Sequence, residues 1–172
     1  MRIGLVGTMS VGKTTLAKAL GETDRFKDHS VQTERSKYLR DLGIPLNTDS
    51  TLKGQFVFLA ERASELFHNN IITDRTIWDV TAFTLSAKSI SDWEKRDFVT
   101  AAMHLRDQYD VVIYVSPDGI EVEDNGIRET NMDYRNKINI AIKMLLEEYK
   151  PTKLITVSGT TEQRIATILQ NI

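Results

Sequence analysis

The sequence predicts an α/β fold in which a parallel sheet of about five strands carries helices on both faces. Short apolar runs alternate with longer segments whose apolar residues recur at helical spacing. Several of these runs are continuously apolar and β-branched, as in strands that are covered on both sides. Such alternation is typical of right-handed strand–helix–strand crossovers in a parallel sheet.

The expected strands and helices follow one another along the chain. Helical spacing is found in segments 52–66, 98–105 and 138–149, and in a last segment that begins near Thr160. Capping boxes predict two helix starts, at Ser91 with Glu94 and at Thr160 with Gln163. Because parallel sheets bind ligands at the carboxyl ends of their strands, functional residues are expected there. The expected strands are residues 2–6, 30–33, 70–73, 111–115 and 154–157.

Composition limits the class of protein. The chain has 172 residues, 41% hydrophobic and 27% charged, which fits a single globular domain over residues 1–172. It has no cysteine, so thiolate chemistry is excluded. The net charge of −2 gives no general attraction to nucleic acid or to an anionic membrane. No apolar run reaches membrane length, and we expect a soluble, intracellular, cytoplasmic protein without a membrane partner.

A phosphate-binding loop follows the first strand. The stretch "GTMSVGKTT" matches G-x-x-x-x-G-K-[ST], and it lies between a predicted strand and a helical pattern. In such loops backbone N–H groups surround the phosphates, the lysine reaches the outer phosphates, and the hydroxyl holds Mg²⁺. The sequence therefore predicts the P-loop NTPase fold with ATP and Mg²⁺ as cofactors. The expected ATP-binding residues are Gly7, Thr8, Met9, Ser10, Val11, Gly12, Lys13, Thr14 and Thr15, with Thr14 on the metal.

A second group of polar residues follows the third expected strand. Asp74 at this strand end is expected to reach Mg²⁺ or to accept the acceptor's proton, and Arg75 beside it to bind an oxyanion. The alternative is that Asp74 caps the next helix and pairs with Arg75. Trp78 is a candidate for stacking on an acceptor base, although a core position is equally consistent with its sequence position.

Two further segments carry candidate catalytic residues. Glu34 after the second strand is a candidate general base, and Arg35 a candidate to orient the acceptor; an exposed, charged helix start is the alternative. The polar segment 117–135 is expected to be a mobile lid loop. Its Arg128 and Arg135 would neutralise charge on a transferring phosphoryl group, unless the segment is only a solvated surface loop.

These segments resemble the P-loop nucleoside and nucleotide kinases along most of the chain. The likeness is closest to nicotinamide riboside kinase-like ATPase/kinase domains, within a broader thymidylate kinase-like group that includes phage 5-hydroxymethyluracil DNA kinases. It rests on "GTMSVGKTT", "TERSKYLRDLGI", "IITDRTIWDVTAF" and "DNGIRETNMDYR". The resemblance implies nucleotide contacts from Gly7 to Thr15, with the metal on Thr14. It also implies acceptor or catalytic roles for Glu34, Asp74 and Arg75, and lid roles for Arg128 and Arg135.

The predicted activity is transfer of the γ-phosphoryl group of ATP to a hydroxyl or phosphate of a nucleoside- or nucleotide-type acceptor. A GTPase is disfavoured because "NKIN" and "PTKL" lack the aspartate that reads guanine. In "IITDR" an arginine takes the place of a motor ATPase's catalytic glutamate. A modified base within DNA remains an alternative acceptor, supported locally by Arg35, Lys37 and Arg40. A non-kinase ATPase or a regulatory nucleotide-binding module also remains open. The sequence makes no prediction of oligomeric state.

Overall fold

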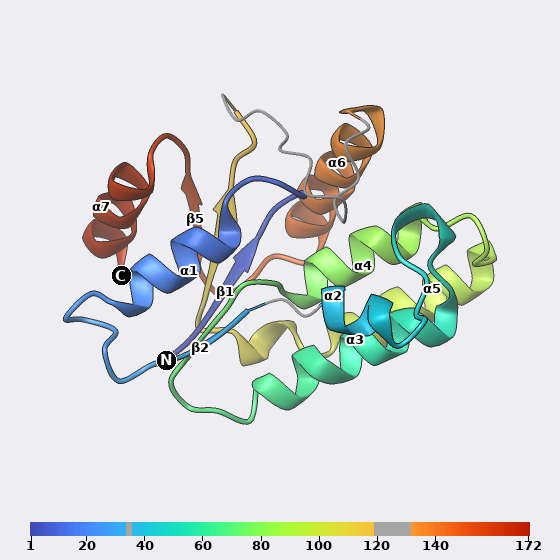
Figure 1. Cartoon of the computed structure of the whole chain (residues 1–172), viewed down its shortest axis with the longest axis horizontal. Helices are drawn as coiled ribbons and strands as arrows, with labels where there is room; N and C mark the ends of the chain where they lie inside the picture. Colours follow the sequence, from blue (N-terminus) through green and yellow to red (C-terminus); the bar gives the residue numbers. More distant parts are fainter. Residues whose placement is uncertain (34–35, 119–131) are drawn as a thin grey trace.

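A five-stranded parallel sheet forms the centre of the protein (Figure 1). The computed structural model describes residues 1–33, 36–118 and 132–172. In this part of the chain the strand order is β2-β3-β1-β4-β5, and every pair is parallel. The predicted sheet is therefore confirmed, with β2 and β3 slightly shorter than expected. The strands are β1 (Arg2–Val6), β2 (Ser30–Gln32), β3 (Ile71–Thr73), β4 (Val111–Val115) and β5 (Leu154–Val157).

The register of the central strand brings distant segments together. Gly4 of β1 is paired with Thr73 of β3 on one side and with Val112 of β4 on the other. Because the strands are parallel, their carboxyl ends lie at one edge of the sheet. The chain leaves β1 at Val6 and β3 at Thr73. The phosphate loop 7–15 therefore lies beside the segment that begins at Asp74.

Helices α1 (Lys13–Gly21) and α7 (Thr161–Asn171) cover one face of the sheet, which we call the aliphatic face (Figure 1). Alternate strand residues point toward these two helices, as the pleat of a strand requires. Their buried apolar side chains form one continuous cluster. It contains Ile3, Leu5, Val11, Leu16, Ala17, Leu20, Phe26, Ile72, Val111, Ile113, Val115, Ile155, Val157 and Ile168.

Helices α3 (Leu52–Glu65), α4 (Ile77–Ser86) and α6 (Met132–Glu148) cover the opposite face, which we call the helical face (Figure 1). Helix α4 is central and packs against α3, α6 and α5 (Asp92–Met103). All but one of its ten residues are buried. Among the described residues, no helix is long and apolar enough to cross a membrane. Short helices complete the fold: α2 (Ser36–Asp41), η1 (Asn47–Asp49) and η2 (Arg106–Gln108).

Within the described ranges, capping boxes begin three of the helices. The predicted boxes Ser91–Glu94 and Thr160–Gln163 are present at α5 and α7. A third box, in which Thr76 caps α4 with Asp79, was not expected. The prediction that Arg135 ends a lid loop is wrong. Helix α6 begins at Met132, so Arg135 lies in its first turn; residues 119–131 lie outside the described ranges.

A glycine in β1 allows the start of α4 to approach the sheet. A Cβ atom at Gly4 would lie 2.5 Å from the Thr76 methyl group and 2.8 Å from the Tyr109 ring. Both distances are far below van der Waals contact, so only glycine fits between β1, α4 and Tyr109. This close approach holds the N-terminus of α4 next to the end of β1, where the phosphate loop begins.

Candidate active site

The phosphate loop joins β1 to α1 at the carboxyl edge of the sheet. A Cβ at Gly7 would lie 2.7 Å from the Val115 carbonyl oxygen, so the loop passes β4 too closely for any side chain there. Ser10 and Gly12 have positive φ values of 58° and 79°. These left-handed residues curve the backbone before α1 begins at Lys13. The result is a tight loop at a helix N-terminus, which is a geometry suited to anions.

Lys13 lies over its own loop. Its Nζ donates to the carbonyl oxygens of Gly7, at 2.6 Å, and Thr8, at 2.9 Å. The same atom is 3.9 Å from Oδ1 of Asp79. The Lys13 side chain is 8% exposed, so its ammonium group is held largely out of water. A cation in this position can turn to the outer phosphates of a nucleotide bound by the loop.

Thr14 and Asp74, the two predicted metal residues, are in direct contact. The Thr14 hydroxyl donates to Oδ2 of Asp74, which joins the first turn of α1 to the end of β3. Asp74 is 1% exposed and its backbone N–H donates to the Gln32 carbonyl oxygen at 2.9 Å. Thr76, and not Asp74, caps α4. The alternative in which Asp74 caps the next helix is therefore wrong.

Arg75 is held next to Asp74 by its backbone and by an aromatic ring. Its guanidinium carbon lies 5.0 Å from the centroid of the Phe83 ring on α4. Its carbonyl oxygen accepts from the Thr73 hydroxyl at 2.6 Å and from the Arg62 side chain at 3.5 Å. The Arg75 side chain is only half-buried. It therefore presents a positioned cation at the same edge of the sheet as the phosphate loop.

An ion pair on α3 contacts the segment from Thr73 to Arg75 and helps to hold it in place. Arg62 Nη2 is 2.7 Å from Oε1 of Glu65, whose other oxygen accepts from the Thr73 hydroxyl at 3.0 Å. Burial raises the pKa of Glu65, and the Arg62 charge opposes that rise. Sequence reasoning missed both residues because their (i, i+3) spacing reads as an ordinary exposed helical pair.

Asp79 is a second buried carboxylate at the site, and sequence reasoning missed it as well. It is fully buried in the first turn of α4. Its Oδ1 accepts from the Gly7 N–H at 3.2 Å, and its Oδ2 accepts from the Thr76 N–H and hydroxyl, both at 2.8 Å. The spacing Thr76-x-x-Asp79 is a capping signal that could have placed it at a helix start. Nothing in the sequence connects it to Gly7.

Two buried arginines reach the loop from different helices. Arg135 of α6 donates from Nε to the Met9 carbonyl oxygen at 3.3 Å, and its own carbonyl accepts from the Thr8 hydroxyl at 3.0 Å. Arg164 of α7 donates to the Val11 carbonyl oxygen at 2.8 Å. Burial lowers the pKa of both guanidinium groups, which nevertheless remain charged at neutral pH. Arg164 was not a candidate from the sequence.

The structure corrects the expectation for Trp78 and leaves three candidates outside its description. Trp78 is fully buried, its Nε1 donates to the Tyr149 carbonyl oxygen at 3.0 Å, and its ring packs 5.6 Å from that of Tyr109. Stacking of Trp78 on an acceptor base was therefore wrong, because the indole is part of the core. Glu34, Arg35 and Arg128 lie outside the described residues.

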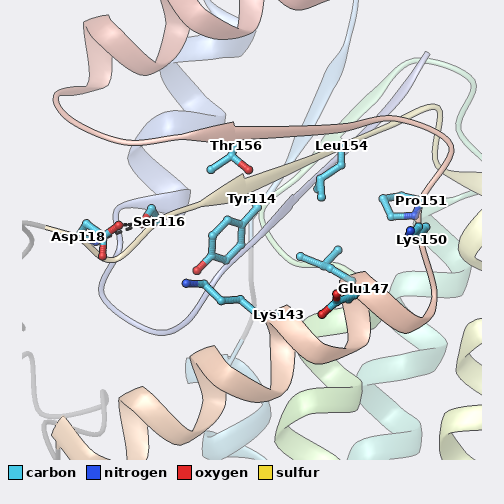
Figure 2. Close-up of a pocket in the computed structure, with 10 residues that line it drawn as sticks. Tyr114, Ser116, Asp118, Lys143, Glu147, Lys150, Pro151, Leu154 and Thr156 are labelled. Atoms are coloured by element: carbon cyan, nitrogen blue, oxygen red, sulfur yellow. Dashed lines mark hydrogen bonds between the residues drawn. The ribbon is translucent and has the colours of Figure 1, made fainter.

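A separate cavity of about 600 Å³ lies between β4, β5 and the second half of α6 (Figure 2). It forms because α6 is the last helix of the helical face, which leaves Leu154 and Thr156 of β5 exposed. Figure 2 shows Tyr114 and Lys143 pointing toward one another across it; the ammonium nitrogen is 5.9 Å from the ring centroid. Its described lining includes no residue of the phosphate loop. The cavity is thus a neighbour of the site and not part of it.

The sheet order, the phosphate loop and the contact between Thr14 and Asp74 define a P-loop NTPase fold of the kind found in nucleoside kinases. A family model described as an AAA domain matches residues 2–164, and the chain belongs to this family. The finer placement among nicotinamide riboside kinase-like or thymidylate kinase-like domains stays a prediction. No curated protein matches the sequence.

Solved structures of a kinase and of a protein in complex with a nucleotide share this fold. Deoxyadenosine kinase from M. mycoides with bound dCTP superposes with a TM-score of 0.68 at 18% identity, over 99% of this chain and 97% of that one. The same enzyme with bound dATP gives 0.61 at 17% identity, over 99% and 97%. YorR protein from Bacillus subtilis, in complex with phosphorylated GDP, gives 0.57 at 17% identity, over 99% and 92%. At these identities the likeness establishes the fold.

Proposed function

We propose that the chain, acting as a single kinase domain over residues 1–172, transfers the γ-phosphoryl group of ATP to a nucleoside- or nucleotide-type acceptor. The observation that carries this proposal is the contact between Thr14 and Asp74. It joins the helix that follows the phosphate loop to the strand end that bears Asp74 and Arg75. A phosphate-binding loop, a carboxylate and a cation thus meet at one edge of the sheet, and phosphoryl transfer needs little more than such positioning and charge neutralisation.

The donor nucleotide would be held by the phosphate loop. Backbone N–H groups between Gly7 and Thr15 would receive its phosphates, and Lys13 would turn from its carbonyl partners to the outer phosphates. The hydroxyl of Thr14 and the carboxylate of Asp74 are hard oxygen ligands of the kind that Mg²⁺ prefers. These two residues would hold Mg²⁺ together with nucleotide oxygens, and the ion supplies charge neutralisation to the phosphates.

The transfer step is a displacement at the γ-phosphorus. An oxygen of the acceptor forms a bond to this phosphorus while the bond to the β–γ bridging oxygen breaks, and ADP leaves. Where the acceptor is a hydroxyl, its proton passes to a carboxylate, either Asp74 or Glu34. Arg75 and Arg35 would orient the acceptor. Arg128 and Arg135 would neutralise the charge that spreads over the transferring group, and the position of Arg135 against the loop supports this role.

A small nucleoside or nucleotide is the acceptor class that we favour. The deoxyadenosine kinase and YorR structures bind nucleotides on the same fold, and the net charge of −2 offers little to a polynucleotide. The alternative acceptor is 5-hydroxymethyluracil within DNA. A further alternative is ATP hydrolysis or nucleotide sensing without transfer, with which the AAA family description is also consistent.

An ADP-release assay with Mg²⁺ and ATP tests the proposal. The acceptor panel contains nucleosides, nucleoside monophosphates, nicotinamide riboside and 5-hydroxymethyluracil DNA, and each reaction is compared with one that lacks an acceptor. We expect ADP only with one small-molecule class, together with a phosphorylated product of the matching mass. ADP release that is equal with and without acceptor would replace the kinase with an ATPase.

Salt dependence separates the two kinds of acceptor. If activity requires DNA, the apparent affinity must fall steeply between about 50 and 200 mM salt, because bound phosphates release counterions. A small acceptor gives a much flatter response. Absence of ADP with every acceptor and in the acceptor-free control would favour a nucleotide-sensing module.

A further inference from the structure

We propose that Asp79 is a positioning residue that acts through Lys13 and limits how tightly the phosphate loop binds a nucleotide. Its carboxylate is fully buried at the start of α4, between the loop and the segment that begins at Asp74. The inference rests on the proposed nucleotide site, and it does not depend on phosphoryl transfer. It assigns Asp79 a role in nucleotide affinity that goes beyond capping a helix.

Both oxygens of Asp79 are used. Oδ1 accepts the Gly7 N–H at 3.2 Å, and Oδ2 accepts the N–H and the hydroxyl of Thr76 at 2.8 Å each. The carboxylate therefore ties the first residue of the phosphate loop to the first turn of α4. A neutral amide cannot accept at both ends, because one end is a donor.

The charge of Asp79 acts on Lys13. The distance from Lys13 Nζ to Asp79 Oδ1 is 3.9 Å, with the two side chains 8% and 0% exposed. At such burial an opposite charge pair attracts far more strongly than it would in water. Asp79 thus draws the ammonium group toward the base of the loop, where it also meets the carbonyl oxygens of Gly7 and Thr8.

Nucleotide binding must overcome this attraction. The phosphates of a nucleotide compete with Asp79 for the same ammonium group, so the buried carboxylate opposes binding by an amount that depends on Lys13. The penalty has a use in a kinase, because a site that holds ADP less tightly releases product more readily. Removal of the Asp79 charge therefore strengthens nucleotide binding, whereas a helix cap with no other role would leave affinity unchanged or weaken it.

The test is a double-mutant cycle on ADP affinity, measured by isothermal titration calorimetry with Mg²⁺. The four proteins are the wild type, Asp79→Asn, Lys13→Met and the double variant. We expect Asp79→Asn to bind ADP about fivefold more tightly than the wild type. We expect that gain to disappear in the Lys13→Met background. Asp92→Asn is the matched control, because Asp92 is an exposed residue in the first turn of α5.

A second variant separates the charge from the cap. Thr76→Val removes the hydroxyl that donates to Asp79 and leaves the carboxylate in place. We expect a lower melting temperature with ADP affinity within about twofold of the wild type. If Asp79→Asn does not fold, Asp79→Ser takes its place in the cycle, because serine is also neutral and its smaller hydroxyl side chain fits the first turn of a helix.

The outcomes distinguish this inference from the proposed function. Weaker or unchanged ADP binding by Asp79→Asn overturns it, and so does a gain of equal size in the Lys13→Met background. If the wild-type protein binds no ADP, the proposed nucleotide site is wrong, and this inference is wrong with it. A protein that binds ADP but phosphorylates no acceptor contradicts only the kinase proposal, and the cycle can still be read.

Discussion

The two faces of the sheet are built from different kinds of side chain. The aliphatic face, under α1 and α7, is packed by Ile, Leu and Val side chains with one phenylalanine and one alanine. The helical face also buries Arg62, Thr73, Asp79 and Arg135, together with aromatic rings such as Trp78. The helices of the aliphatic face contribute the buried charges of Lys13 and Arg164, and both of these side chains contact the phosphate loop. Because buried charges cost free energy unless they are paired, their position around the loop marks where chemistry is placed. The aliphatic face supplies stability, and the helical face positions the site.

Removal of a charged group at the phosphate loop should lower activity strongly and leave the fold intact. We expect Lys13→Ala and Asp74→Asn each to lower kcat by at least about a hundredfold, because each removes a group that stabilises the transferring phosphoryl group or its ligands. ADP release with the best acceptor measures this, and the far-UV circular dichroism should not change. Lys18→Ala, at an exposed position on α1, is the control. Near-wild-type turnover in both variants would remove these residues from the mechanism.

Truncation of a side chain on the aliphatic face should have the opposite effect, lowering stability while kcat stays almost unchanged. Ile3 is fully buried at the end of β1 that lies away from the loop. We expect Ile3→Ala to lower the free energy of unfolding by about 2–5 kcal/mol, since it loses apolar burial and leaves a cavity. Urea denaturation measures this loss. Below the unfolding transition, kcat should stay within about twofold of the wild type, and a large fall in kcat would show that the two faces are not separable in this way. Ile3→Val should cost about 0.5–1.5 kcal/mol.

Gly4 lies in the same strand but faces the other side. We expect Gly4→Ala to lower the free energy of unfolding by about 1–3 kcal/mol, because its methyl group would overlap Thr76 and the Tyr109 ring. Unlike Ile3→Ala, it should also lower kcat, since displacement of Thr76 moves the start of α4 and Asp79 with it. Kinetics and urea denaturation on one preparation compare the two losses. Loss of stability with unchanged kcat would contradict this prediction, because it would show that the position of the start of α4 does not affect the site.

The smallest expected effect concerns the pH dependence of stability. Burial raises the pKa of Glu65, so the native state binds this proton more tightly than the unfolded state does. Its contribution is present below the ordinary carboxyl pKa and is lost as the pH rises through the raised value. Relative to Glu65→Gln, the wild type should lose unfolding free energy as the pH rises above the ordinary carboxyl pKa of about 4, by at most about 1.4 kcal/mol per pH unit. Parallel profiles for the two proteins would contradict the shifted pKa.

Local patterns in the sequence were sufficient for the sheet and the loop. Most of the strands were found because parallel strands are short continuous apolar runs, β2 with its polar Ser30 and Gln32 giving a weaker pattern. The phosphate loop was found because its glycines and lysine have fixed spacing. The meeting of Thr14 with Asp74 follows from the rule that parallel strands end at one edge. Each of these inferences needs only residues close in sequence and one topological rule.

The residues that were missed depend on contacts between distant segments. Helix α4 is buried almost all round, with polar residues such as Asp79 and Thr81 among the buried ones, so it has no polar outer face by which an amphipathic helix is recognised. For the same reason the polar role considered for Trp78 could not be rejected before its burial was known. Arg164 and Asp79 reach the loop from α7 and α4, and no local spacing encodes these contacts.

The strand order also affects how the protein folds. Arg2 pairs with Ile71, and Ile3 pairs with Val111, so the central strand is made first but acquires its two neighbours only after long stretches of chain have followed it. Contacts this far apart in sequence slow folding, because the chain loses the entropy of a long loop before the favourable contacts between the strands can form. At a synthesis rate of about 5–20 residues per second, several seconds pass between the synthesis of β1 and that of its neighbours β3 and β4. During that time the apolar run Arg2–Val6 is an unpaired strand edge, open to chaperones and to aggregation.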